Sequence, residues 1–172
     1  MSVPSTAVAE VGEEFGPWIG RSQYRTTAEF SDAVAAKYQQ LYDQGYSDTM
    51  DLVGRGLVAN DNTVIGSRVD ALARNGLRDW LSNVEGIEEG PGSIIQVNRR
   101  LYDPSGSGAY RIPDVYIPGA NAIFDGTIAY KTNLLDQTID FNAFSGGGSV
   151  TIIRPSGLVT NGVQGSYGLY FP

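Results

Sequence analysis

The chain has 172 residues, of which 41% are hydrophobic and 18% charged, a size and composition typical of one folded domain. It contains neither cysteine nor histidine, which excludes disulfides, thiolate metal sites and histidine-based catalysis. The net charge of −7 arises from residues 1–90, which carry 14 acidic and 7 basic groups, whereas residues 91–172 carry 5 of each. Any chemistry must therefore use carboxylates, lysine, tyrosine, hydroxyls or amides.

The sequence predicts neither a membrane-spanning helix in the chain nor a cleaved signal peptide at its start. No apolar run approaches the roughly 18 residues that a membrane-spanning helix needs. The first residues lack a basic region followed by a long apolar stretch, which is the pattern of a secretory signal peptide. Export by another route stays open. Residues 1–26 contain several glycines and prolines and are expected to form an irregular lead-in or linker.

Two helices are predicted in the first half of the chain. From Thr27, taken as the N-cap, apolar and aromatic residues recur at helical spacing as far as Gly45, taken as the stop. The pattern of residues 48–60 does not clearly favour one structure and is compatible with a further short helix. A second helix follows the capping cluster at residues 61–63 and is expected to end near Asn83.

The second half of the chain is predicted to build a sheet. Alternating apolar residues and turn residues indicate three strands, a short amphipathic helix, a buried strand and an edge strand or hairpin, at residues 94–102, 110–117, 122–130, 133–144, 150–154 and 158–172. This order of three meandering strands, a helix and a returning strand predicts an α+β fold with a mixed sheet flanked by helices.

Two aspartates on the second and third predicted strands are the strongest candidates for a functional site. With the connecting turn centred at residues 119–122, Tyr116 lies opposite Asp125, and Asp114 and Asp125 share one face as diagonal neighbours, about 7–8 Å apart. Two carboxylates placed in this way repel each other unless a cation lies between them. Mg²⁺ (or Mn²⁺), which takes oxygen ligands, is the expected ion.

These residues carry a resemblance to the PD-(D/E)xK, or restriction-endonuclease-like, nuclease superfamily. Pro113-Asp114 and Asp125-Gly126-Thr127-Ile128 resemble the paired acids of that motif. Residues 63–155 are similar to nuclease domains of bacterial polymorphic toxins, such as Rhs-type and type VI secretion effectors. The resemblance implies a restriction-endonuclease-like core with αβββαβ order at residues 61–172, preceded by a linker and helical extension at residues 1–60.

The resemblance also implies roles for five residues. Asp114 and Asp125 would bind the metal ion, and Asp70, on the helix before the sheet, is the candidate for a third acidic ligand. Lys131 would orient or help to activate the attacking water, and Gln137 on the following helix would support it.

The position of the lysine departs from the usual motif. That motif places the lysine two residues after the second acid, whereas Lys131 follows Asp125 by six residues, which span about 20 Å along a straight strand. The strand bends after Gly126, or the lysine has migrated, or Lys131 is not catalytic. Thr127 occupies the usual lysine position.

The implied activity is that of a metal-dependent endonuclease, which hydrolyses phosphodiester bonds; the resemblance favours DNA as the substrate and leaves RNA open. As a toxin domain of interbacterial competition, it would be a secreted effector that reaches the target-cell cytoplasm and is neutralised in the producing cell by a cognate immunity protein. Two other classes stay open. One is a catalytically degenerate module that binds nucleic acid or protein, and the other is a structural domain of a secretion or phage particle.

Purely structural roles also stay open for these residues. Asp114 after a proline and Asp125 before a glycine suit a turn and a bulge. Asp70 suits an ion pair with Arg74 on a solvated helix face, and Gln137 suits a helix surface. Four arginines on or beside the strands could contact phosphates or protect strand edges, namely Arg99, Arg100, Arg111 and Arg154.

Overall fold

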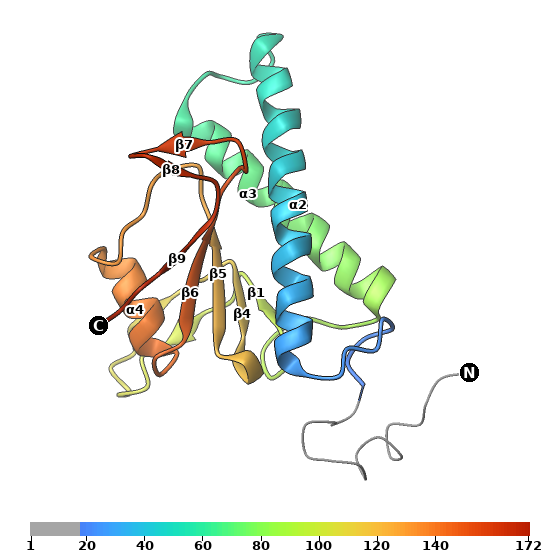
Figure 1. Cartoon of the computed structure of the whole chain (residues 1–172), viewed down its shortest axis with the longest axis vertical. Helices are drawn as coiled ribbons and strands as arrows, with labels where there is room; N and C mark the ends of the chain where they lie inside the picture. Colours follow the sequence, from blue (N-terminus) through green and yellow to red (C-terminus); the bar gives the residue numbers. More distant parts are fainter. Residues whose placement is uncertain (1–17) are drawn as a thin grey trace.

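The computed structural model describes residues 18–172 and shows an α+β fold in which a pair of helices precedes a mixed sheet (Figure 1). Part of the expected lead-in, residues 1–17, lies outside the described residues. Residues 18–26 form a turn closed by a bridge between Ile19 and Tyr24. The helical segments are α2 (Thr27–Gly54), α3 (Asn62–Asp79), the π-helical turn η1 (Trp80–Glu85), the 3₁₀ turn η2 (Pro118–Ala120) and α4 (Asp136–Phe144).

Helix α2 is capped by Thr26, whose hydroxyl accepts a hydrogen bond from the Glu29 N–H, and it runs without a break to Gly54. The predicted stop at Gly45 is wrong. Gly45 is buried where α2 crosses α3, and a Cβ there would lie 3.4 Å from Leu72 Cβ and 3.6 Å from the Val69 carbonyl oxygen. The missing side chain therefore allows the two helices to approach closely.

Helix α3 begins at Asn62, within the predicted capping cluster of residues 61–63, because the Asp61 carboxylate accepts a hydrogen bond from the Val64 N–H and caps the helix. Its buried stripe is Ile65, Val69, Ala73 and Leu77. The helix passes into η1, which ends before Gly86, a residue in the left-handed conformation with φ of 69°. The predicted end near Asn83 therefore falls within this last turn.

The strands are shorter than predicted, and two of them are divided. Their bounds are β1 (Gln96–Val97), β2 (Leu101–Tyr102), β3 (Tyr110–Arg111), β4 (Val115–Ile117), β5 (Ala122–Gly126), β6 (Ser149–Ile153), β7 (Val159–Thr160), β8 (Val163–Gln164) and β9 (Tyr167–Leu169). Asn98, with φ of 55°, separates β1 from β2, and Pro113, which has no N–H to donate, separates β3 from β4.

The main sheet has the strand order β1-β4-β5-β6-β9. Strands β1, β4 and β5 pair antiparallel, α4 carries the chain across to β6, which is parallel to β5, and β9 pairs antiparallel with the other edge of β6. The expected meander, helical crossover and returning strand are thus confirmed. Strands β2 and β3 form a separate hairpin, as do β7 and β8.

The two faces of the sheet pack against different helices (Figure 1). Phe124 and Val115 pack with α2 and α3 in one core cluster, and Ile123 and Ile152 pack with Phe141 of α4 in the other. Helix α2, which the sequence places in the N-terminal extension, thus shares one core with α3 and the sheet. Among residues 18–172, no helix combines the length and the apolar character needed to cross a membrane.

Candidate functional site

Asp114 and Asp125 are brought together where β4 begins and β5 ends. The two strands pair Val115 with Phe124 and Tyr116 with Ile123, so the next step of the ladder sets the two aspartates opposite each other. The predicted register, with Tyr116 opposite Asp125, is shifted by two residues. The turn closes earlier than predicted, because η2 and a left-handed Asn121 place Ala122 opposite Ile117. A shift of two residues keeps both side chains on the same face.

Asp114 is held by two internal donors. Its Oδ2 accepts a hydrogen bond of 2.6 Å from the Gly126 N–H, and its Oδ1 lies 3.1 Å from Arg74 Nη1. The side chain is buried, and burial, followed by the charges of Asp125 and Asp70, raises its pKa from 3.8 to about 7. Its two donors lower the pKa only in part. The pKa of Asp114 therefore stays raised, because burial and the negative charges of Asp125 and Asp70 outweigh the effect of the two donors.

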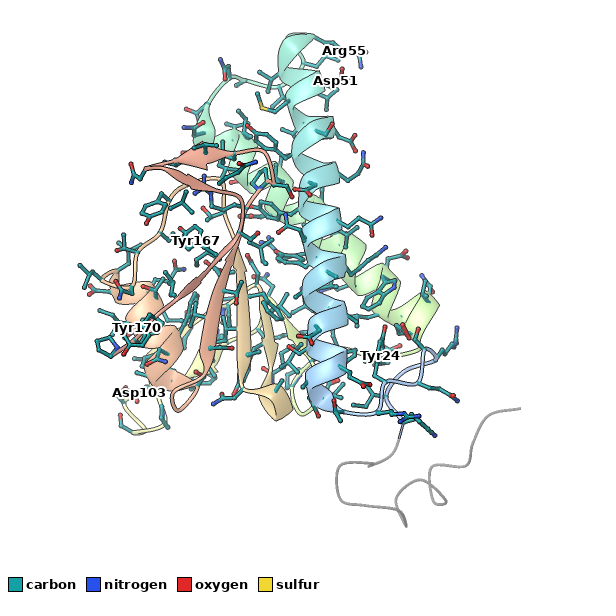
Figure 2. All side chains as sticks on the ribbon, in the orientation of Figure 1. Tyr24, Asp51, Arg55, Asp103, Tyr167 and Tyr170 are labelled. Atoms are coloured by element: carbon teal, nitrogen blue, oxygen red, sulfur yellow. The ribbon has the colours of Figure 1, made fainter. Side chains whose placement is uncertain are left out.

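Asp125 contacts Lys131, and Lys131 in turn contacts Gln137, the two further residues that the resemblance implies. The Lys131 ammonium lies 2.8 Å from Asp125 Oδ2 and 2.9 Å from Gln137 Oε1, which comes from α4. The predicted strand to residue 130 is wrong, since β5 ends at Gly126 and the chain leaves the sheet after Thr127. Tyr167 extends from β9 (Figure 2). Its hydroxyl holds the returning chain, because it accepts a hydrogen bond from the Lys131 N–H and donates one to the Lys131 carbonyl.

Asp70 joins the two strand aspartates from the side of α3. The Tyr42 hydroxyl donates a hydrogen bond of 2.5 Å to Asp70 Oδ1, and burial raises the pKa of this carboxyl. The surface ion pair between Asp70 and Arg74 is not observed, because the Arg74 guanidinium pairs with the Asp114 carboxylate instead. We refer to Asp70, Asp114 and Asp125 as the acid cluster, because the charge of Asp125 raises the pKa of both Asp70 and Asp114, and the charge of Asp70 raises the pKa of Asp114.

A pocket of about 320 Å³ opens beside the acid cluster. It lies between the first turns of α3 and the loop that follows β5, and Asp70 forms part of its wall. The remaining lining residues are Asn62, Thr63, Gly66, Ser67, Thr127, Ile128 and Ala129. The pocket gives a ligand access to Asp70 from solvent. Thr127, at the usual lysine position, lines this pocket and contacts its own loop through the Ala129 N–H.

Most of the strand arginines are engaged within the chain. Arg99 pairs with Glu89 at 2.8 Å and Arg111 with Asp140 at 2.7 Å. Arg154 is completely buried and donates to the Thr160 hydroxyl. The Arg100 guanidinium lies 4.5 Å from the centre of the Tyr110 ring. Arg99, Arg100 and Arg111 thus have partners within the chain, whereas Nε and Nη1 of the buried Arg154 have no hydrogen-bond partner among residues 18–172.

Three residues of the site were not singled out in the sequence: Tyr38 and Tyr42 of α2, and Arg74 as a partner of Asp114. The two tyrosines lie one helical turn apart on the apolar stripe, a spacing that indicates core packing. One feature of the sequence could have indicated their role. A tyrosine at a predicted core position needs a hydrogen-bond partner for its hydroxyl, which suggests polar groups nearby.

The donors in the acid cluster suit a hard divalent cation, which prefers carboxylate oxygens. Asp125 Oδ1 and Asp70 Oδ2 accept no hydrogen bond from residues 18–172, whereas both oxygens of Asp114 are engaged. Within the same residues, no three acidic side chains already stand close enough to enclose an ion. Cation binding would therefore require the carboxylates to draw together, with Asp114 exchanging one of its present partners.

Comparisons with protein-family models, with curated proteins and with solved structures found no match for this chain.

Proposed function

We propose that the chain is a metal-dependent nuclease of the PD-(D/E)xK type, which hydrolyses phosphodiester bonds. The observation that carries the proposal is the meeting of Asp125, Lys131 and Gln137 beside a buried partner, Asp114. An ion pair alone would be a common structural feature. Here it adjoins two further acids whose pKa values are raised, the buried Asp114 and the half-buried Asp70, a combination that favours a functional site.

Within this proposal, Asp125, Asp114 and Asp70 would hold a Mg²⁺ or Mn²⁺ ion. When bound, such an ion polarises a phosphate and lowers the pKa of a water molecule. Lys131 has two functions in this arrangement. Its ammonium fixes the orientation of Asp125, and it presents donors to an incoming phosphate oxygen or water. Gln137 keeps Lys131 in place by accepting one of its hydrogen bonds.

The substrate and setting belong to the same proposal. DNA is the favoured substrate and RNA the second. As a toxin domain, the chain would act in the cytoplasm of a competing cell after delivery, and the producing cell would need an immunity protein. That immunity protein would have to cover the pocket beside Asp70.

Digestion of plasmid DNA with and without Mg²⁺ tests the proposal. The native chain is compared with Asp114→Asn, Asp125→Asn and a control, Asp136→Asn, in which an exposed carboxylate at the start of α4 is changed. We expect metal-dependent cutting by the native chain and the control, and a loss of at least about a hundredfold in the two cluster variants, since each removes a charge that acts on the reacting phosphate. If the native chain cuts neither DNA nor RNA, the nuclease proposal fails.

A binding module without turnover is the second candidate. The engaged oxygens of Asp114 and the lack of a closed three-acid group among residues 18–172 favour it. Such a module would bind a nucleic acid or protein through the same pocket. Binding to labelled DNA that is unaffected by Mg²⁺ and is never followed by cutting would support this function over the nuclease.

A further inference from the structure

The acid cluster carries one more negative charge than the cations paired with it. Arg74 pairs with Asp114 at 3.1 Å, and Lys131 pairs with Asp125 at 2.8 Å. Asp70, the third member, has no ion-pair partner in the described part of the chain. Arg74 and Lys131 act on its charge from a distance, because each is bound to another carboxylate. A cation from outside the chain would balance the charge that remains on Asp70.

Asp70 is held in place on one side and is accessible on the other. Its Oδ1 accepts a hydrogen bond of 2.5 Å from the Tyr42 hydroxyl, whereas its Oδ2 accepts none from residues 18–172. The half-buried side chain forms part of the wall of the pocket of about 320 Å³ between α3 and the loop after β5. A ligand in this pocket can therefore reach a carboxylate whose orientation is already fixed.

The pocket has a polar wall and an aliphatic one. The polar wall is one face of α3, on which intervals of three and four residues align Thr63, Gly66, Ser67 and Asp70. The two hydroxyls are exposed. Gly66 adds no side chain, and a Cβ there would lie 3.6 Å from Cγ1 of Ile128 in the loop opposite. The pocket thus offers a row of oxygen acceptors that ends in a carboxylate, beside an apolar surface.

We propose that this pocket binds a guanidinium group on an aliphatic stem, as in an arginine side chain or a small guanidino compound. The cation supplies the charge that Asp70 lacks, and its N–H donors pair with the carboxylate and the helix hydroxyls. The stem packs on Ile128. A guanidinium suits the row of acceptors better than an ammonium, because it is planar, carries more donors and is more weakly hydrated.

The inference goes beyond the proposed function, since it requires neither a metal ion nor turnover. A guanidinium and a metal ion would exclude each other at Asp70. Plasmid cleavage is therefore no readout for this pocket, and failure of the nuclease proposal would leave the guanidinium site standing.

NMR of the native chain labelled with nitrogen-15 tests the proposal, with n-butylguanidinium as the probe. We expect saturable binding with a Kd of about a millimolar, as for a small fragment, and the largest amide shifts at residues 63–70 and 127–129. n-Butylurea, which has a similar shape and no charge, should bind at least about tenfold more weakly, since it cannot neutralise the carboxylate. n-Butylammonium should also bind more weakly than n-butylguanidinium.

Asp70→Asn should weaken binding of n-butylguanidinium by at least about tenfold, because it removes the charge and keeps an acceptor for Tyr42. Asp136→Asn, which removes an exposed carboxylate at the start of α4, is the matched control and should bind the probe as the native chain does. The amide spectrum of each variant shows whether it is folded. If Asp70→Asn does not fold, the comparison with n-butylurea on the native chain decides.

The proposal is overturned by any of four results: no saturable binding, shifts confined to other residues, equal affinity for n-butylurea, or unchanged affinity in folded Asp70→Asn. Tighter binding of n-butylammonium would overturn the assignment to a guanidinium. A blocked tripeptide with a central arginine separates the two sources of the group. If the tripeptide binds more tightly than n-butylguanidinium, the site takes an arginine of a protein partner, and if it binds more weakly, the site takes a small guanidino compound.

Discussion

The Lys131 ammonium lies 2.8 Å from Asp125 Oδ2, although six residues separate the two in the chain. A straight strand would place them about 20 Å apart. The contact exists because β5 ends at Gly126 and Tyr167 holds the returning chain through both backbone groups of Lys131. A lysine outside the usual motif spacing thereby reaches the acid that it would serve.

This contact predicts graded effects of substitution on DNA cleavage. Lys131→Met should lower cleavage by at least about a hundredfold, because it removes the donor beside Asp125. Gln137→Ala should lower it by roughly tenfold, since Lys131 remains but loses its support. Thr127→Ala, at the usual lysine position, should retain nearly native activity. Initial rates of plasmid cleavage measure all three, and a larger loss in Thr127→Ala than in Lys131→Met would contradict the assignment.

The raised pKa of Asp114 predicts how stability depends on pH without metal. Its pKa is 3.8 in the unfolded chain and about 7 in the folded one, so between these values the folded chain keeps a proton that the unfolded chain has lost. Its contribution to stability is therefore complete below pH 4 and is lost as the pH rises towards 7. Asp114→Asn should remove this dependence, with a relative gain on the order of 2–4 kcal/mol between pH 4 and pH 8.

Urea denaturation of the native chain and Asp114→Asn at several pH values, in the presence of EDTA, measures this difference. Other groups titrate in both proteins, so the comparison isolates Asp114. Parallel stability curves for the two proteins would show that the Asp114 carboxyl has no raised pKa.

Gly126 is expected to tolerate no side chain. A Cβ there would lie 2.5 Å from Tyr42 Cε1 and 3.0 Å from Tyr38 Oη, so Gly126→Ala should displace the tyrosines or β5 and destabilise the fold by about 1–3 kcal/mol. Gly168→Ala, in β9, is the matched control, because its Cβ would meet no atom within 4 Å. Chemical denaturation compares the two, and equal stabilities would argue against the close packing of α2 on β5.

The crossing of α2 and α3 predicts a size limit at Gly45. Gly45→Leu should destabilise the fold by about 1–3 kcal/mol, since its Cβ alone would already contact Leu72 and Val69, and a larger side chain has to separate the helices. Gly54→Ala, at the open end of α2, should be neutral or stabilising, because nothing lies within 4 Å of its Cβ and alanine favours a helix. Thermal unfolding separates these outcomes. A gain of stability in Gly45→Leu would mean that Gly45 does not lie at a tight crossing.

Features that depend on neighbouring residues follow from local sequence patterns. The Asp61 cap sets the start of α3, and the change from helical to alternating periodicity marks the passage from helices to sheet. The order of strands, crossover helix and returning strand follows from the same local patterns. Asp114 and Asp125 could be paired because a two-residue error in register leaves a side chain on the same face.

Tertiary packing alone decided the remaining features. Gly45 continues a helix because α3 packs closely against it. Strand β5 ends at Gly126, whose N–H donates to Asp114 and whose missing side chain makes room for Tyr42 and Tyr38. Tyr38 and Tyr42 follow an ordinary core pattern in the sequence, and only the fold sets the Tyr42 hydroxyl against Asp70 and the Tyr38 hydroxyl against Gly126. Local propensities are weak compared with the free energy of contacts between segments far apart in the chain, so those contacts set the ends of the elements and the composition of the site.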